Sequence, residues 1–184
     1  RDRPGRHPRH LRELTRRRRK PLFVKMVPWE NDREKHNRLD LVERALYYGV
    51  DGFTIPGTWN QPDTSLSLGR GHISGRIAFP KTLEVVRSIY AVVGDRAVIK
   101  ALGGISSGEE AFAAIAAGAT LVELLTAFVY QGWNVAYRIN RELAARMAQE
   151  GFPSIEALRG SARETPVREL LQSRSVSVQM ADSN

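Results

Sequence analysis

The residues with the clearest potential for chemistry lie in segment 98–120, "VIKALGGISSGEEAFAAIAAGAT". Gly103 and Gly104 follow an apolar run, and Ser106 and Ser107 precede a segment with helical character. Backbone without side chains lets a ligand approach closely, and a helix start presents unpaired N–H groups with a partial positive charge. The pattern therefore allows a phosphate site. A tight turn followed by a serine helix cap, closed by a glutamate, would use the same residues.

Further candidate residues follow other apolar runs. Lys25 lies inside one run, Pro56-Gly57-Thr58 end the next, and Thr126 lies near the end of a later one. A lysine supplies positive charge, a threonine supplies a hydroxyl, and a glycine supplies open backbone. If these runs are parallel strands, their carboxyl ends meet at one edge of a sheet, where α/β folds place their ligands.

Composition narrows the function classes. The chain has 184 residues, 42% of them hydrophobic, which suffices for one domain with a core. It has no run of about eighteen apolar residues, so no membrane span is expected. The absence of cysteine excludes disulfides and thiol catalysis. We expect no metal site, because the four histidines show no ligand spacing: His7, His10, His36 and His72.

The net charge of +8 comes from the first twenty residues. They hold ten Arg or Lys against Asp2 and Glu13, which leaves eighteen basic and eighteen acidic residues in 21–184. We interpret 1–20 as a basic leader, a solvated helix end or loop before the first strand. A polyanion-binding arm is the alternative, but nucleic acid is not expected because no aromatic residue lies among the arginines. At the other end, residues 162–184 are expected to form a poorly ordered polar tail.

Four strand-helix units follow the leader. The predicted strand and helix ranges are 21–27 with 31–50, 51–57 with a helix from about residue 80, 96–102 with 106–118, and 120–130 with 134–149. Such a series requires a parallel sheet with right-handed crossovers. The polar segment 58–79 is expected to be a long loop, and loops of roughly twenty residues in compact domains are functional or disordered.

Several ordered motifs resemble one known family. They are "PLFVKMVP", "GVDGFTIPGT", "HISGRIAF", "ALGGISSGEEAFAAIAAGATLVELLTAFVYQG" and "INRELAARMAQEGFPSIEALRGS". From about Lys20 to Ser161 the chain resembles the carboxyl-terminal half of dihydroorotate dehydrogenase, most closely the quinone-linked class. The resemblance implies an α/β fold, a (β/α)8 barrel of which the last four units are present. Four strands cannot close a barrel, so we expect a piece of a longer protein, with pairing of two copies as the alternative.

The resemblance also implies a cofactor and a reaction. Family members bind FMN and oxidise dihydroorotate to orotate in pyrimidine synthesis, with quinone reoxidising the flavin in this class. Lys25 matches the lysine at the flavin ring, Gly75 and Gly104 match glycines that contact FMN, and Leu125 with Thr126 matches the pair that holds the phosphate. The expected location is cytoplasmic or peripheral on the inner membrane, through a segment upstream of the barrel.

The chain departs from the family at the substrate. The family has Thr-Asn-Thr where this chain has Pro56-Gly57-Thr58, so Pro56 lies near the flavin while Gly57 and Thr58 lie at the substrate. Glycine lacks the amide that binds the orotate ring, which leaves open a diverged flavin oxidoreductase with another substrate. The family's catalytic base, a serine in this class, belongs to the other half of the barrel. The isolated chain is therefore expected to be inactive.

Overall fold

The computed structural model describes residues 6–162, with side chains from residue 11 onward. The expected polar tail lies outside the described residues except for Ala162. The helices are α1 (Arg6–Arg17), α2 (Asp32–Tyr47), α3 (Phe79–Val93), α4 (Gly108–Ala116), α5 (Thr126–Gln131), α6 (Val135–Gln149) and α7 (Ile155–Leu158), with two 3₁₀ turns, η1 (Arg76–Ala78) and η2 (Gly94–Arg96). The strands are β1 (Phe23–Lys25), β2 (Gly52–Thr54), β3 (Trp59–Pro62), β4 (Arg70–Ile73), β5 (Val98–Leu102) and β6 (Leu121–Glu123).

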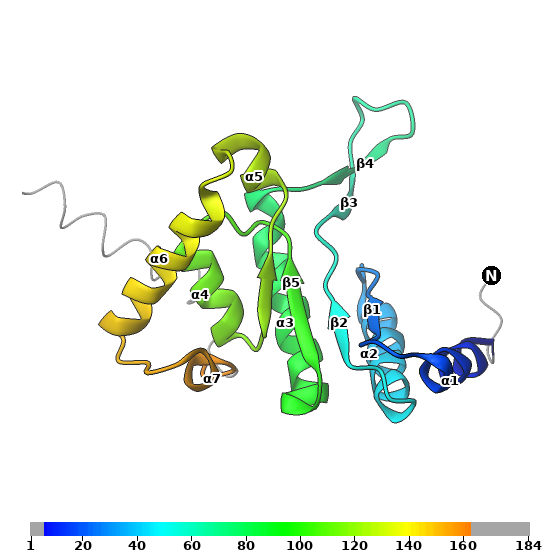
Figure 1. Ribbon diagram of the computed structural model, residues 1–184. Helices are drawn as coiled ribbons and strands as arrows, with labels where there is room; N and C mark the ends of the chain where they lie inside the picture. The colour runs from blue at the N-terminus through cyan, green and yellow to red at the C-terminus, as the bar shows by residue number, and fades with distance from the viewer. Residues whose placement is uncertain (1–5, 163–184) are drawn as a thin grey trace, which may run out of the picture.

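Four strands form one parallel sheet in the order β1-β2-β5-β6, which confirms the sheet expected from the strand-helix units. Lys25 pairs with Thr54, and Thr54 pairs with Lys100, so these three side chains share one face. The helices α2, α3 and α4 lie on the other side of the sheet (Figure 1). Because the strands are parallel, their carboxyl ends meet at one edge, below the β3–β4 hairpin in Figure 1.

The hydrophobic core lies between the sheet and these helices. On β5, Ile99 and Ala101 are fully buried, whereas Val98, Lys100 and Leu102 alternate to the other face and are half-buried. This alternation follows from the two-residue repeat of a strand. Helix α3 supplies the following fully buried side chains: Leu83, Val85, Val86, Ile89 and Val93.

Side-chain caps fix the starts of two crossover helices. The Asn31 side chain accepts a hydrogen bond from the Glu34 N–H at the start of α2, at 2.9 Å. The Ser107 side chain accepts from the Glu110 N–H at the start of α4. Each cap satisfies a backbone donor that has no partner within its helix. The serine cap allowed by the sequence is therefore confirmed at Ser107.

The amino-terminal leader contains a helix. Leu11 of α1 packs against the core, and Arg18 beyond its end forms an ion pair with Asp51. The same carboxylate oxygen of Asp51, Oδ2, also accepts from the Leu22 N–H at 2.6 Å. Part of the basic segment thus holds the sheet at the amino ends of its strands. Among the described helices, none is both long and apolar enough to cross a membrane.

The expected loop 58–79 is wrong in part, because it contains an antiparallel hairpin. In the β3–β4 pairing, Trp59 lies opposite Ile73 and Pro62 lies opposite Arg70. Trp59 is buried and anchors the hairpin to the core. Most of the intervening residues are polar and exposed, and Leu66 and Leu68 are exposed as well, so the two strands lack the alternation by which a strand is recognised.

The expected strand 120–130 is also wrong beyond its first residues. Strand β6 ends at Glu123, and Thr126 begins α5 instead of continuing the strand. Helical hydrogen bonds run from the Val129 N–H to the Leu125 carbonyl and from the Gly132 N–H to the Phe128 carbonyl. The run 120–130 is mostly apolar, and hydrophobicity alone does not separate a buried strand from a short helix.

Candidate functional site

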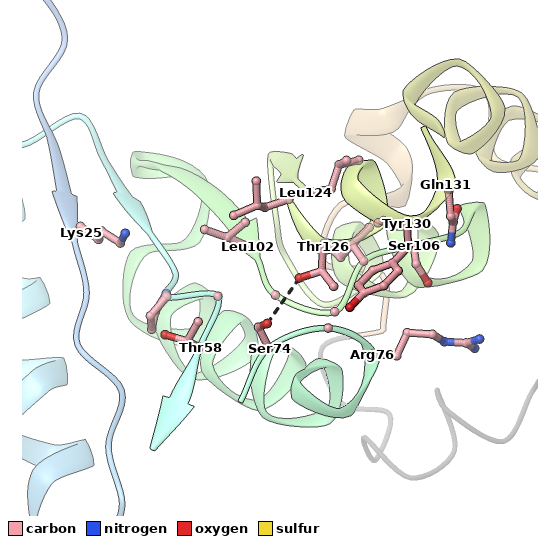
Figure 2. A pocket seen from close by; sticks show the side chains of 18 residues that line it. Lys25, Thr58, Ser74, Arg76, Leu102, Ser106, Leu124, Thr126, Tyr130 and Gln131 are labelled. Carbon is pink, nitrogen blue, oxygen red and sulfur yellow. Dashed lines mark hydrogen bonds between the residues drawn. The ribbon is translucent and has the colours of Figure 1, made fainter. Parts of the chain in front are cut away.

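A cavity of about 410 Å³ opens at the carboxyl ends of the sheet strands (Figure 2). All eight residues predicted from the sequence line it: Lys25, Pro56, Gly57, Thr58, Gly75, Gly104, Leu125 and Thr126. The other lining residues are Ser74, Arg76, Leu102, Gly103, Ile105, Ser106, Leu124, Ala127, Tyr130 and Gln131. The volume lies within the range of small-molecule and cofactor sites, about 300–1,000 Å³.

Four parallel strands bring these residues together. Lys25 is the last residue of β1, and Pro56-Gly57-Thr58 follow β2. The Gly103-Gly104 pair follows β5, and the turn after β6 carries Leu125 and Thr126. Because the strands are parallel neighbours, residues that are up to about a hundred positions apart in the chain face one cavity.

Glycines at one end of the cavity occupy positions that a side chain could not share. Gly104 has φ +76°, and a Cβ there would lie 2.7 Å from the Phe79 nitrogen and 2.9 Å from the Gly75 carbonyl oxygen. Gly75 has φ +83°, and its Cβ would lie 3.3 Å from Cγ2 of Thr126. The Thr126 and Ser74 hydroxyls lie 3.5 Å apart beside them. This cluster of Ser74, Gly75, Gly104 and Thr126, called the glycine cradle below, offers open backbone and two hydroxyls.

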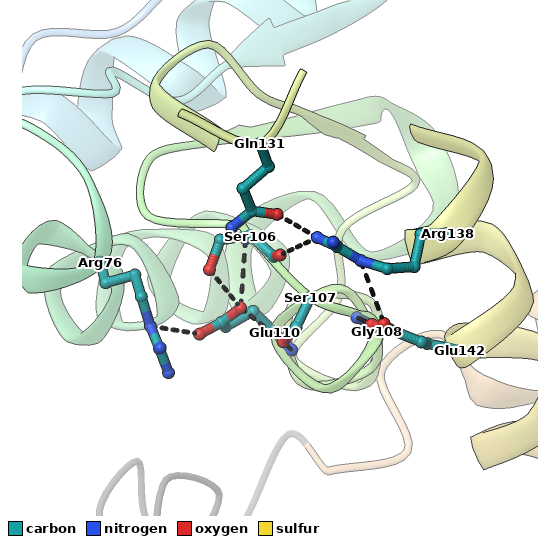
Figure 3. A network of polar contacts seen from close by, with 8 residues as sticks. All are labelled: Arg76, Ser106, Ser107, Gly108, Glu110, Gln131, Arg138 and Glu142. Carbon is teal, nitrogen blue, oxygen red and sulfur yellow. Dashed lines mark hydrogen bonds and ion pairs between the residues drawn. The ribbon is translucent and has the colours of Figure 1, made fainter. Parts of the chain in front are cut away.

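The first turn of α4 is closed by the protein's own carboxylates (Figure 3). Oε2 of the buried Glu110 accepts from the Ser106 N–H at 3.1 Å, from the Ser106 hydroxyl at 3.0 Å and from the Ser107 hydroxyl at 2.6 Å. The Gly108 N–H donates to Glu142 at 2.6 Å. A phosphate at this helix start would have to displace the carboxylate of Glu110 or of Glu142. The geometry thus favours the cap over a ligand at this helix start.

Two arginines extend the carboxylate network of Figure 3. The Arg76 guanidinium lies 3.2 Å from the second oxygen of Glu110, although Arg76 itself is largely exposed. Arg138 donates to the Ser106 carbonyl at 3.5 Å and to the Gln131 side chain, and it lies 3.3 Å from Glu142. The network connects η1, α5 and α6 to the glycine loop, residues 103–107 between β5 and α4, behind the glycine cradle.

Lys25 lies at the opposite end of the cavity from Arg76 (Figure 2). Its side chain is exposed, and among the described residues it has no hydrogen-bonded or ion-paired partner. In Figure 2 the cradle residues Ser74 and Thr126 lie between Lys25 and Arg76, so a ligand that filled the cavity would meet the Lys25 ammonium at one end and the glycine cradle further along.

Sequence reasoning missed several lining residues. Ser74 and Arg76 flank the predicted Gly75 in the motif "HISGRIAF", so that motif contained the available signal. Tyr130 and Gln131 enter the cavity wall because α5 begins at Thr126, and the assignment of that segment to a strand hid them. Leu102 was not singled out, because its position depends on how two loops pack.

Comparisons with known proteins agree with this architecture. Residues 7–147 match the family model described as dihydroorotate dehydrogenase. The chain is 36% identical over 140 residues to dihydroorotate dehydrogenase (quinone) of Parvibaculum lavamentivorans, covering 74% of this chain and 39% of that protein. It is 38% identical over 142 residues to the protein of the same name from Thermobifida fusca, covering 73% of this chain and 37% of that protein.

Solved structures give the same result for the fold. The DHODH of Eimeria tenella in complex with ferulenol superposes with a TM-score of 0.70 at 33% identity, covering 81% of this chain and 40% of that one. The ligand-free structure gives a TM-score of 0.67 at 32% identity, covering 78% and 40%. The chain thus spans about 40% of the length of these relatives, and its four strand-helix units form part of a (β/α)8 barrel. The chain belongs to the dihydroorotate dehydrogenase family.

Proposed function

We propose that this chain supplies the carboxyl-terminal half of a flavin site in an enzyme that oxidises dihydroorotate to orotate in pyrimidine synthesis. The observation that carries the proposal is the convergence of all eight predicted residues on one cavity, seven of them from the ends of the four sheet strands and Gly75 from the turn before η1. The names of the relatives support the reaction, because they are dihydroorotate dehydrogenases that use quinone.

The residues present fit FMN. Gly75 and Gly104 line the cavity with backbone alone, and Ser74 and Thr126 add two hydroxyls beside them that could bind a phosphate. The free ammonium of Lys25 suits negative charge on a ring at the other end of the cavity. When bound, FMN would supply the hydride acceptor of the reaction. Lys25 orients and electrostatically stabilises that ring, and Thr126 positions the phosphate.

The part of the cavity expected to bind the substrate has fewer polar groups than the part expected to bind FMN. Thr58 offers a hydroxyl and Gly57 offers backbone only, so the chain contributes few polar contacts to a substrate ring. Ser106, which also lines the cavity, is held by Glu110 and does not act as the base. We place the base in the portion of the family barrel that this chain does not span. A diverged flavin oxidoreductase remains the second candidate, and Gly57 is the observation that favours it.

Quinone as electron acceptor fits the surface beside the cavity. Leu125 and Tyr130 both line the cavity and are 68% and 84% exposed, and Phe128 and Val129 expose further apolar surface on α5. Such a patch suits an apolar ring compound approaching from a membrane face. We propose that the whole protein is cytoplasmic or bound peripherally at the inner membrane.

The experiment compares FMN with riboflavin, which lacks the phosphate, by fluorescence titration of the purified 184-residue chain. We expect weak FMN binding, weaker riboflavin binding, and no turnover of dihydroorotate. Thr126→Val should shrink the preference for FMN, while the control Thr64→Val on the exposed hairpin loop should preserve it. Equal affinity for the two flavins would contradict the proposed phosphate site. A purified chain that oxidises dihydroorotate would contradict the placement of the base.

A further inference from the structure

Leu102, the last residue of β5, fills the space beside Gly57 in the cavity wall. A Cβ on Gly57 would lie 2.8 Å from Cγ of Leu102 and 3.2 Å from its Cδ2. Both residues line the cavity, with Pro56 and Leu124 as neighbours in the lining. The wall that they form is hydrocarbon, apart from backbone.

The two positions cannot easily separate. The Ile55 N–H donates to the Lys100 carbonyl at 2.9 Å, which holds the segment before Gly57 to β5. A Cβ on Gly103 would lie only 3.2 Å from the Gly57 Cα, so the two loop backbones are in contact. A side chain at position 57 therefore requires Leu102 to change its rotamer or to be replaced.

We propose that Leu102 is a specificity-determining residue, and that the Leu102–Gly57 wall selects a ring substrate with a hydrocarbon edge. A polar ring edge placed against this wall would lose its hydrogen bonds to water and gain none. This inference rests on the second candidate of the proposed function, the diverged flavin oxidoreductase that Gly57 favours, and it takes the cavity as the site of the reaction.

The steric part is tested by a double-mutant cycle on thermal unfolding of the 184-residue chain. Gly57→Ala should lower the Tm by several degrees when Leu102 is present and by little in the Leu102→Ala background. A Leu121→Ala background is the matched control, because Leu121 lies at the exposed start of β6 outside the cavity lining. In that background Gly57→Ala should keep its full effect. Equal effects of Gly57→Ala in all three backgrounds would overturn the proposal.

The selective part is tested by titrating benzoate and orotate, two ring carboxylates with an apolar and a polar ring edge, at saturating FMN. The wild-type chain should bind benzoate at least as tightly as orotate. The Gly57→Asn, Leu102→Ala double variant should shift the ratio about five- to tenfold toward orotate, and Gly57→Asn alone should shift it less. A wild-type preference for orotate, an unchanged ratio, or binding of neither compound would overturn the proposal. If the wild-type chain binds FMN no more tightly than riboflavin, the proposed function is refuted instead.

Discussion

At the scale of single residues, Glu110 organises the loop behind the candidate site. Its carboxylate is 3% exposed, and it accepts three hydrogen bonds from Ser106 and Ser107 while facing Arg76. A buried carboxylate needs such partners, because burial without them is costly. The network affects function indirectly. It fixes the backbone of the glycine loop, and it leaves the glycine cradle as the proposed position for an anion.

Replacing Glu110 tests this network. Glu110→Gln keeps the shape but removes the charge, and it turns one acceptor oxygen into a donor that faces donors. We expect a loss of about 1.5–3 kcal/mol in the free energy of unfolding. Glu109→Gln is the control, because the Glu109 side chain is 45% exposed and its pair with Arg146 is 3.6 Å long, so about 0.5 kcal/mol or less is expected. Urea unfolding measures both, and similar losses would contradict the role given to Glu110.

Gly104 provides a second prediction at this scale. Gly104 and Gly151 have nearly the same φ, +76° and +75°, but only Gly104 has atoms near the place of a Cβ. Gly151→Ala should cost about 1–2 kcal/mol from the left-handed backbone alone. Gly104→Ala should cost roughly 1–3 kcal/mol more, because the methyl group would press on Phe79. Urea unfolding measures the loss in the free energy of unfolding for both variants. A loss for Gly104→Ala no larger than that for Gly151→Ala would refute the close packing around Gly104.

At the scale of elements, α3 anchors the segment that follows β1. The Trp29 indole N–H donates to Oε1 of Glu84 at 2.9 Å, and the Lys81 ammonium donates to Oε2 at 2.8 Å. Burial raises the pKa of Glu84, but hydrogen bonds from Lys81 and Trp29 and the charges on Lys81 and Lys35 outweigh it, so that the pKa lies below its ordinary value. Deprotonated Glu84 thus stabilises the folded state.

This pKa predicts a pH dependence. Because the folded-state pKa is depressed, the contribution of Glu84 is fully present above the unfolded-state pKa of about 4.3 and is lost as pH falls through the lower folded-state value. Glu84→Gln should lower stability at pH 7 and flatten the acid limb of the stability curve. The measurement is the free energy of urea unfolding between pH 7 and pH 3. Parallel curves for wild type and variant would contradict the prediction.

Elements also show how far the sequence alone reaches. The parallel sheet, its crossover helices and most cavity-facing residues follow from apolar runs and from the residues at their ends, whereas Gly75 and Leu125 follow only from the family resemblance. The β3–β4 hairpin does not, because Trp59 is its one buried residue, Ile73 is only half-buried, and most of its other residues are polar and exposed. Helix α5 could not be predicted from the sequence either, because a largely apolar run is compatible with a strand or a helix. The Leu102–Gly57 contact depends on loop packing, which no local pattern encodes.

At the scale of the whole molecule, the described sheet has one face covered by helices and one face with mixed polarity. That second face carries Lys100, whose ammonium lies 3.7 Å from Glu123 and 4.1 Å from the centre of the Phe23 ring. In the described sheet, β1 and β6 each pair on one side only. The arrangement agrees with a chain that spans about 40% of its relatives' length, and it keeps the strand ends in register for the cavity.

We propose that one flavin spans the cavity, with its phosphate at the glycine cradle and its ring toward Lys25. Amide chemical shifts of the 15N-labelled chain, recorded during titration with FMN and with riboflavin, test it most directly. FMN should shift the amides of Gly75, Gly104 and Thr126, and both flavins should shift Gly57 and its neighbours. Riboflavin should leave the cradle amides nearly unchanged. Identical shift patterns for the two flavins, or shifts confined to the opposite edge of the sheet around Asp51, would contradict the account.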